Sequence, residues 1–503
     1  MNTSKAKRAV KNVVFSVLVK ILTFAVGIVI PRLLIVSYGS ATNGLLQTVS
    51  SIFTYIGLIF AGVGSAGIQG LYKPLANNDR QEISAVLVAV KQYYRKLLFW
   101  FAICSCGFGL LFPLIIQGEL SFGVVSGVIL IEGFSLILTY YFTYTMQTLL
   151  TADGRDYVIQ LIQFAVFLVT SATKILLILS GVSVLVLQFA YLLINILQIS
   201  IYKAYIRRQY PWIDWQATPN HTPLEKRKNF LINGVAWTVF SSTDTVLISA
   251  FCGLALTSVY SMYNMVFANL NLILAFFYSS IYFILGQVYH KDQTEYLALH
   301  DGFESVISGL TFGVLATAYV LILPFLRLYT QNIHDINYID GYLPILFCVV
   351  QILSNARMIS GNLINLTNNP QLTNKASIIE VIINLALSIL LVNLIGIHGV
   401  LIATAVGLLY KTNFIINVSN RKILKRSPIR TYITLGTNCL LFAVVAIVSG
   451  YVDLGIDSYV KFFAVGAVVM ILLMVLFCGV NFAVNPTAIK RCLQALRGGK
   501  TAS

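Results

Sequence analysis

The sequence predicts an all-α polytopic membrane protein with about 14 transmembrane helices, arranged as two six-helix lobes in a parallel pseudo-two-fold repeat plus two extra helices. Three observations predict this fold. Apolar stretches long enough to cross a bilayer recur along the chain, lysines and arginines fall in alternate gaps between them, and short motifs recur at an offset of about 215 residues.

The composition excludes a soluble protein. Of 503 residues, 58% are hydrophobic and 10% are charged, whereas a soluble domain carries about 25% charged residues. A spanning helix needs roughly 20 mostly apolar residues. Windows of this length predict spans at 12–34, 45–67, 97–116, 122–149, 157–179, 183–206, 230–255, 258–287, 303–328, 342–366, 375–394, 397–416, 432–450 and 460–484. The first stretch begins like a signal peptide, but it is too long and contains Lys20, so we interpret it as a retained span.

The distribution of positive charge predicts the topology. Cations cluster at the N-terminus, in the second, sixth and twelfth gaps and in the C-terminal tail, and the odd-numbered gaps hold none. The positive-inside rule then places both termini in the cytoplasm. The twelfth gap holds Lys411 and the run from Arg421 to Arg430, which we interpret as a topology-setting loop rather than a nucleic-acid or phospholipid patch. The net charge of +16 therefore requires no nucleic-acid partner.

Matching motifs indicate that the chain is internally repeated. The corresponding pairs are Lys11-Asn12 with Lys228-Asn229, Gly39 with Gly253, and Gly181-Val182 with Gly396-Ile397. Each half holds six spans, so both halves have the same orientation, as in transporters whose substrate site lies between the repeats. We predict an N-lobe at 1–206, a cytoplasmic linker at 207–229, a C-lobe at 230–416, and a last part at 417–503 that holds the two extra helices and a basic cytoplasmic tail.

One cytoplasmic segment is compatible with two structures. Ile83, Val86, Leu87 and Val90 recur at helical spacing and precede the basic residues 91–96. This pattern predicts either a separate helix on the membrane surface or an extended beginning of the third span.

No motif points to an enzyme. The run from Gly62 to Gly67 matches the dinucleotide fingerprint by letter, but it ends a spanning segment instead of linking a strand to a helix. The histidines and cysteines lack metal-ligand or disulfide spacing, and the gaps are too short for a catalytic domain. We therefore expect no catalytic residues, no metal and no cofactor.

Charged residues inside the spans are the main functional signal, because a charge at the helix centre costs about 2.5–3.5 kcal/mol. Lys20 and Arg357 lie well inside spans one and ten, and Glu132 and Asp244 lie near mid-membrane. Four others lie nearer to span ends and could reach the interface instead: Arg32, Lys174, Glu304 and Glu380. The alternative to a functional role is mutual pairing, for example of Lys20 with Asp244 or of Arg357 with Glu132.

Asparagines also cluster in the second half of the chain, among them Asn233, Asn264, Asn271 and Asn355. Amide groups in hydrocarbon need hydrogen-bond partners. Asn233, Asn264 and Asn355 are candidates for lining a hydrophilic cavity that binds sugar hydroxyls. Hydrogen bonding between helices is the alternative.

Several stretches carry a resemblance to a known family. They are Pro31-Arg32-Leu33-Leu34 through Tyr38-Gly39 to Asn43-Gly44-Leu45, then Gly62-Val63-Gly64-Ser65-Ala66 with Leu71-Tyr72-Lys73-Pro74-Leu75-Ala76, and the Tyr-Tyr-Arg core of residues 91–96. With the repeat and the span count, the chain resembles the bacterial polysaccharide-unit (Wzx-type oligosaccharide-lipid) flippases of the multidrug/oligosaccharidyl-lipid/polysaccharide exporter superfamily.

This resemblance implies two lobes around a central cavity lined by spans one, two, seven and eight. It implies export of an undecaprenyl-pyrophosphate-linked oligosaccharide across the bacterial cytoplasmic membrane by alternating access, for cell-surface polysaccharide biosynthesis. The lipid tail would stay among membrane lipid, and a polysaccharide polymerase is an implied partner.

Under this hypothesis the substrate pyrophosphate binds Lys20, Arg32 and Arg357, assisted by Lys174. Asp244 and Glu132 are the candidates for coupling to a proton or a sodium ion. A cation-coupled multidrug exporter of the same superfamily is the first alternative, and a membrane enzyme of polysaccharide assembly is the second.

Overall fold

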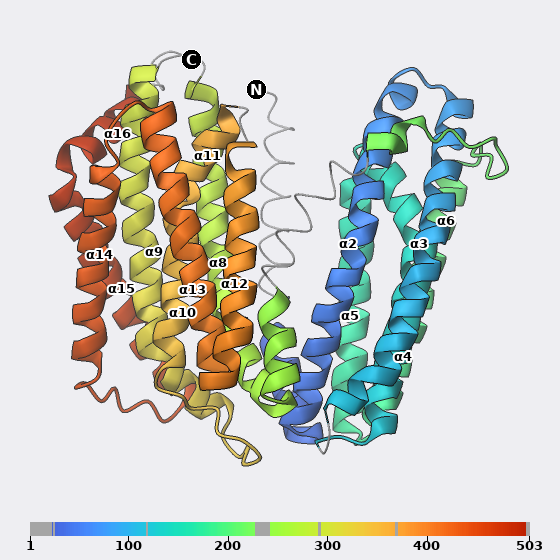
Figure 1. Ribbon diagram of the computed structural model, residues 1–503, viewed down its shortest axis with the longest axis horizontal. Coiled ribbons are helices and arrows are strands. Elements are labelled where there is room, and N and C mark those ends of the chain that lie inside the picture. The colour runs from blue at the N-terminus through green and yellow to red at the C-terminus, as the bar shows by residue number, and fades with distance from the viewer. Residues whose placement is uncertain are drawn as a thin grey trace. The chain divides into compact units, whose positions relative to one another are not determined.

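The computed structural model describes Thr23 and residues 26–116, 119–226, 242–289, 293–367 and 371–498 (Figure 1). All regular structure in these ranges is helical. Within them, ten helices are long and apolar enough to cross a membrane. The helix Val26–Tyr38, the helical residues 242–251, and helices α2 (Ser40–Ala76) and α8 (Leu254–Tyr289) overlap the remaining predicted spans. The predicted all-α polytopic membrane fold is confirmed.

The chain forms two compact units, Met1–Ser258 (unit 1) and Val259–Ser503 (unit 2). Besides α2, unit 1 contains α3 (Arg80–Ile115), α4 (Phe122–Ala152), α5 (Asp156–Leu179), α6 (Val184–Gln209) and the short helix η1 (Thr222–Lys226). Unit 2 contains most of α8, then α9 (Gln293–Tyr329), α10 (Leu343–Ala356), α11 (Met358–Leu366), α12 (Gln371–Ile395), α13 (Ile397–Asn417), η2 (Val418–Ile423), α14 (Ile429–Ser449), α15 (Tyr459–Val484) and α16 (Pro486–Gly498). The predicted lobe and linker boundaries stay a prediction.

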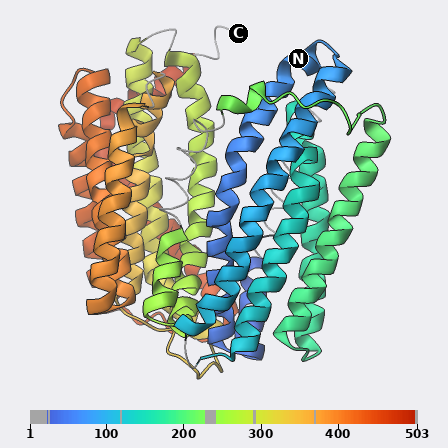
Figure 2. The same ribbon diagram turned by 45° about the vertical axis from the view of Figure 1, so that its right-hand side comes forward.

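Aromatic packing holds α2, α3 and α4 together in unit 1. The Phe60 ring lies 4.7 Å from the Tyr140 ring and 5.9 Å from the Phe101 ring, and Phe53 stacks on Phe101 at 5.6 Å. Such pairs contribute about 0.5–1.5 kcal/mol each beyond the area that they bury. Close side-chain packing of this kind matters inside a bilayer, where lipid is as apolar as the core. The helices of this unit run along a common direction (Figure 2).

The basic segment 91–96 belongs to one continuous helix. Helix α3 has 36 residues and is therefore about 54 Å long, which exceeds the hydrocarbon thickness of about 30 Å. It begins at a cap in which the Asp79 side chain accepts a hydrogen bond from the Glu82 amide at 3.0 Å. Of the two alternatives, the structure shows the extended beginning of the third span and not a separate surface helix, because the helix starts at the Asp79 cap and continues without a break into the span.

Backbone turns at matched positions agree with the predicted repeat. The glycines Gly39, Gly253, Gly181 and Gly396 have φ values of 84°, 92°, 70° and 60°. Glycine adopts this left-handed region without steric cost, so the same turn recurs before α2 and α8, and again after α5 and α12. Asn43 donates to Ser258 at 2.8 Å, and these two residues are 215 positions apart, the offset of the repeat.

The contact between α2 and the start of α8 leaves no room for a side chain at Gly44. An ideal Cβ there would lie 1.8 Å from the Leu254 carbonyl oxygen. Overpacking typically costs about 1–3 kcal/mol, so we expect Gly44→Ala to lower the thermal stability of the purified protein. Gly107→Ala in α3 is the matched control, because its Cβ would meet nothing within 4 Å. Equal melting temperatures for the two variants would contradict the close contact.

The last three helices pack on α9. Small residues allow this close approach. A Cβ atom added at Gly309 or Gly313 of α9 would lie 3.3 Å from backbone atoms of α15. Asn438 of α14 and Asn481 of α15 exchange two hydrogen bonds, at 3.0 and 2.8 Å. Polar pairs of this kind hold helices together where no water competes.

The predicted basic tail includes an amphipathic helix, α16. Its face formed by Ala488, Ile489 and Cys492 is buried, whereas Lys490 and Arg491 are exposed. Cys492 belongs to a buried cluster that includes Tyr296 and Leu299 of α9. Burial raises the pKa of the Cys492 thiol to about 11, so this cysteine stays protonated at neutral pH and packs as a small apolar side chain.

Candidate functional site: charged residues buried in the helix bundles

Two cations and one carboxylate meet inside unit 2, and we name Arg357, Glu380 and Lys411 the charge triad. Arg357 is the single residue between α10 and α11, Glu380 lies in α12 and Lys411 lies in α13. The Arg357 Nη1 atom donates to Glu380 Oε1 at 2.9 Å, and the Lys411 Nζ atom donates to Glu380 Oε2. Glu380 is only 1% exposed, so both of its oxygens are occupied inside the bundle.

The charge triad has one positive charge in excess, because one carboxylate faces two cations. Removing ions from water is costly, and a buried pair repays this cost only when its geometry is good and its partners are satisfied. Here both carboxylate oxygens have a partner, whereas the two cations carry one more charge than the carboxylate neutralises. The arrangement therefore attracts an anion at a depth where a lone cation would be unfavourable.

The charge triad changes three of our expectations. The suggested pairing of Arg357 with Glu132 is wrong, because the carboxylate partner of Arg357 is Glu380. The Glu380 side chain does not extend to the membrane interface, because it is buried and its two oxygens bind Arg357 and Lys411. Lys411 was placed in a cytoplasmic gap, but it lies within the helical residues 397–423 and binds a buried acid. The role of Arg357 in binding pyrophosphate stays a prediction.

Amide groups near the charge triad form a network between α8 and α10. Asn355 donates to Asn271 Oδ1 at 3.0 Å and to the Gln351 carbonyl at 2.8 Å, while Asn271 donates to the Gln351 side chain. Asn355 and Gln351 are 6% and 7% exposed. Hydrogen bonding between helices, one of the two alternatives for Asn355, is therefore realised.

Asn355 also lines a small cavity between α9, α10 and α14, with a volume of about 30 Å³. Glu304 and Thr431 lie on the opposite wall, where the Thr431 hydroxyl donates to Glu304 Oε1 at 2.8 Å. Glu304 is 9% exposed, so it too lies inside the bundle instead of at an interface. The cavity combines a carboxylate, hydroxyls and an amide, and its volume suits ordered water.

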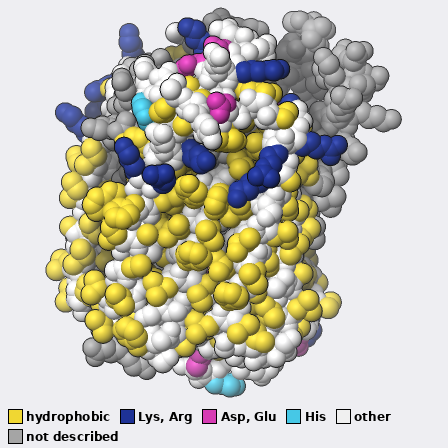
Figure 3. Space-filling model, turned by 90° about the vertical axis from the view of Figure 1, so that its right-hand side faces the viewer, with side chains coloured by type: hydrophobic (Ala, Val, Ile, Leu, Met, Phe, Trp, Pro, Cys, Tyr) yellow, Lys and Arg dark blue, Asp and Glu magenta, His cyan; other side chains and the backbone are white. Residues whose placement is uncertain are grey.

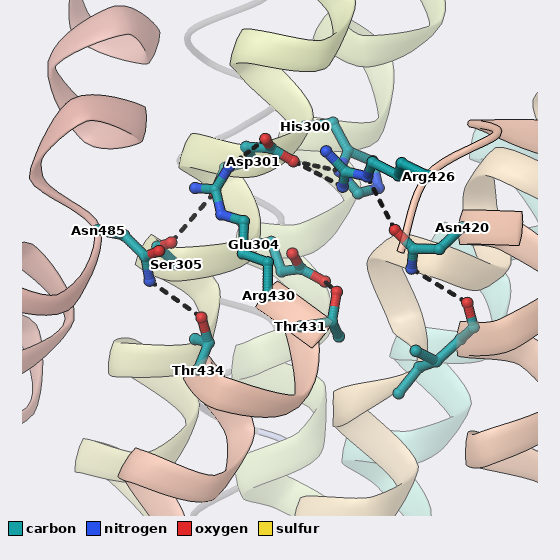
Figure 4. Close-up of polar contacts among 11 residues, drawn as sticks. His300, Asp301, Glu304, Ser305, Asn420, Arg426, Arg430, Thr431, Thr434 and Asn485 are labelled. Atoms are coloured by element: carbon teal, nitrogen blue, oxygen red, sulfur yellow. Dashed lines mark hydrogen bonds and ion pairs between the residues drawn. The ribbon is translucent and has the colours of Figure 1, made fainter. Parts of the chain in front are cut away.

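An electrostatic junction lies at one end of α9 (Figure 4). The Asp301 carboxylate forms an ion pair with Arg426, whose Nη2 atom lies 2.7 Å from Oδ1, and accepts a hydrogen bond from Arg430. The His300 Nδ1 atom lies 3.3 Å from the same carboxylate. Arg426 in turn donates to Asn420 at 2.9 Å. Two cations of the basic run 421–430 thus attach the first turn of α14 and the segment before it to α9.

His300, Asp301 and Glu304 together resemble a metal site, since one ligand atom from each lies within 4.8 Å of the others. Both Asp301 oxygens already face guanidinium groups, and Thr431 occupies one oxygen of Glu304. A metal ion would have to displace these positive groups. The geometry therefore favours a structural junction over a metal centre.

In unit 1, Glu132 of α4 and Lys174 of α5 form a second pair of opposite charges. Their carboxylate and ammonium groups interact electrostatically, and both side chains are half-buried. The Lys174 Nζ atom also lies 4.9 Å from the centre of the Tyr191 ring of α6. The structure thus brings together two residues for which we expected different roles, coupling and phosphate binding.

The remaining predicted site residues lie elsewhere in the chain. Asp244 is 5% exposed and follows Thr243, whose hydroxyl lies 2.5 Å from that of Tyr55 in α2. Arg32 is half-buried in the helix Val26–Tyr38, and Asn264 is exposed on α8. Lys20 and Asn233 lie outside the described residues, so their predicted roles stay predictions.

The fold and these charges define an all-α polytopic membrane protein that keeps ion pairs inside its helix bundles. No protein-family model and no curated protein matches the sequence. Solved structures do match. The lipid II flippase MurJ, in an inward closed conformation, is similar over 94% of this chain and 99% of its own, at 14% identity and a TM-score of 0.69.

Two transporters of another kind also share the fold. An inward-facing multidrug resistance MATE family transporter of the MOP superfamily is similar over 84% of this chain and 95% of its own, at 12% identity and a TM-score of 0.62. The Vibrio cholerae MATE transporter VcmN is similar over 81% and 96%, at 14% identity and a TM-score of 0.51. This chain therefore shares the fold of these transporters, and the superfamily and the oligosaccharide-lipid flippase within it stay predictions.

Proposed function

We propose that this chain is a flippase that moves an undecaprenyl-pyrophosphate-linked oligosaccharide from the cytoplasmic to the outer leaflet by alternating access, for cell-surface polysaccharide biosynthesis. The observation that carries the proposal is the positive charge in excess at the charge triad. A pyrophosphate is a strong anion that hydrocarbon excludes, so its carrier needs cations at membrane depth. The likeness to a lipid II flippase supports flipping as the activity.

In this proposal Lys20, Arg32 and Arg357 bind the pyrophosphate. Lys174 assists with a weaker field, because Glu132 opposes its charge. The protein would lie in the bacterial cytoplasmic membrane with both termini in the cytoplasm, and a polysaccharide polymerase would receive the flipped unit. The structural neighbours are transporters, which favours a transporter over an enzyme of polysaccharide assembly.

Neutralising Lys20 and Arg357 together tests the proposal. We expect the Lys20→Gln/Arg357→Met variant to abolish surface polysaccharide in a strain that depends on this protein, at an unchanged protein level. The matched control is Lys375→Met, which removes an exposed cation from α12 and should leave the polysaccharide normal. Normal polysaccharide in the double variant would defeat the assignment of these two residues.

A cation-coupled multidrug exporter is the second candidate. Asp244 favours it, because this acid is 5% exposed inside a predicted span and the MATE transporters share the fold. Glu132 is the second candidate for binding a proton or a sodium ion. If Asp244→Asn removes drug resistance, and deletion of the protein leaves the polysaccharide unchanged, the exporter is the correct function.

A further inference from the structure

A cation-lined pocket opens in unit 1 between α3, α4, α6 and the segment 210–221 that follows α6. It holds about 730 Å³ of empty space, part of it open to the surroundings. Lys91, Lys203 and Arg207 line it, together with aromatic and apolar side chains, and none of the described lining residues is acidic. On the face shown in Figure 3, lysine and arginine side chains form a belt above a broad hydrophobic surface.

Aromatic rings hold two of these cations in place. The Lys203 Nζ atom lies 3.8 Å from the centre of the Phe142 ring, and the Lys91 Nζ atom lies 5.2 Å from that of Trp215. A cation–π contact uses the positive charge but no particular N–H donor. Each ammonium therefore keeps donors that can bind phosphate oxygens.

The wall that carries Trp215 is fastened to the beginning of α3. The Asp214 amide donates to Ser84 Oγ at 3.2 Å, and Asn220 donates to Glu82 at 2.6 Å. The position of Trp215 is thus set by hydrogen bonds on both sides along the chain. A pocket with a fixed wall needs less ordering when a ligand binds.

The charges of the pocket are not balanced by the protein. Among the described residues, no carboxylate forms an ion pair with Lys91, Lys203 or Arg207. The Thr145 hydroxyl, on the inner wall, is buried and has no hydrogen-bond partner there. A neighbouring pocket differs, because the acids Asp79 and Glu82 line it together with Lys73. We therefore expect the positive charge of this pocket to be neutralised by an anion that is not part of the chain.

The depth of the pocket matches a lipid headgroup. Lys203 lies six residues before the end of α6, which is about 9 Å along the helix axis. Further into the span, Leu193, Ile196 and Leu197 of the same helix are 52%, 42% and 51% exposed, as expected for side chains that contact acyl chains. A phosphate at the cations and acyl chains along α6 would both be accommodated.

We propose that this pocket binds the phosphate of an anionic phospholipid, such as phosphatidylglycerol, in the leaflet at the cation-rich ends of the helices. Basic pockets between transmembrane helices bind such headgroups, and juxtamembrane cations attract them. The pocket is separate from the residues that we assign to the transported pyrophosphate. It gives the protein a site for resident membrane lipid, and the proposal does not depend on the flippase function.

Native mass spectrometry of the full-length protein tests this site, with phosphatidylglycerol and with phosphatidylcholine of the same acyl chains. The variant Lys91→Gln/Lys203→Gln/Arg207→Gln should bind phosphatidylglycerol about 100-fold more weakly, because each interfacial cation strengthens such binding about fivefold. The control Arg95→Gln/Lys96→Gln/Arg208→Gln removes three exposed cations of α3 and α6 outside the pocket and should keep the affinity. Lys91→Arg/Lys203→Arg should keep it as well, which separates charge from folding.

Three outcomes would overturn the proposal. Equal losses in the two triple variants would indicate a diffuse belt of charge and no site. If inorganic phosphate bound to the pocket as tightly as phosphatidylglycerol, the pocket would be a site for a free anion. Loss of undecaprenyl pyrophosphate binding with phosphatidylglycerol retained would assign the pocket to the transported lipid. The site is supported if the protein prefers phosphatidylglycerol over phosphatidylcholine only when the three pocket cations are present.

Discussion

Replacing Glu380 with glutamine is expected to lower the free energy of unfolding by about 3–5 kcal/mol, the cost of breaking a buried ion pair by removing one partner. Glu380 is 1% exposed and is the only carboxylate that the described structure gives to Arg357 and Lys411. Its neutralisation leaves two cations facing each other in a medium of low dielectric constant. Thermal unfolding of the purified protein, followed by tryptophan fluorescence in a fixed detergent, measures the loss.

Two other variants of the charge triad separate charge from packing. Arg357→Met and Lys411→Met each remove the excess charge and leave a neutral pair on Glu380, so both should unfold at temperatures well above that of Glu380→Gln. Asp453→Asn is the control for loss of a carboxylate. Asp453 is exposed in the loop after α14, and asparagine can still accept the hydrogen bond from the Gly455 amide, so stability should change by less than about 0.5 kcal/mol. Stability of Glu380→Gln equal to that of the wild type would contradict the ion pairs.

Hydropathy and charge placed the spans well, because both properties depend only on position along the chain. Each predicted span overlaps a described helix, and the glycine pairs at the repeat offset adopt matching left-handed turns. The same reasoning placed Arg357 and Glu380 within spans. A spanning helix has nearly fixed length and composition, so its depth in the membrane is readable from sequence.

The partners of the charged residues could not be predicted in the same way. Pairing depends on which face of each helix turns toward its neighbours, and helices that are apolar all round carry almost no periodic signal. Glu380 and Arg357 are 23 residues apart, and Lys411 is 31 residues beyond Glu380. Lys411 was missed because it was counted with the cations of the twelfth gap, although position 411 lies inside the predicted span 397–416 and within α13. The sequence did contain one useful signal. Glu380 lies in a predicted span, and the spans on either side of it in the chain carry Arg357 and Lys411.

The junction at Asp301 is a second case in which the partners of charged residues could not be predicted from the sequence. A basic run near a span end indicates topology, and Arg426 and Arg430 were interpreted only as topology-setting charges. In the structure both guanidinium groups bind one carboxylate on α9. Charge that sets orientation during insertion also holds the folded protein together, and only tertiary contacts reveal this second use.

The second prediction concerns transport and rests on the proposed function. An apolar version of the charge triad, Arg357→Met/Glu380→Leu/Lys411→Met, should fold, because buried ion pairs replaced by well-packed apolar side chains are often neutral or stabilising. We nevertheless expect it to flip an undecaprenyl-pyrophosphate-linked oligosaccharide about 10- to 100-fold more slowly, since one charge-assisted contact contributes about 1.5–3 kcal/mol. Proteoliposomes with a fluorescent substrate and an external quencher measure this rate.

The charge-preserving variant Lys411→Arg completes this test. It keeps one positive charge in excess on Glu380 and should retain most of the flipping rate, whereas Arg357→Met alone should lose it at nearly wild-type stability. Across these variants we expect the flipping rate to follow the net charge of the three side chains, while stability stays close to that of the wild type. If the apolar version flips the substrate at the wild-type rate, the buried positive charge does not contact the pyrophosphate, and the residues that bind it must lie elsewhere in the chain.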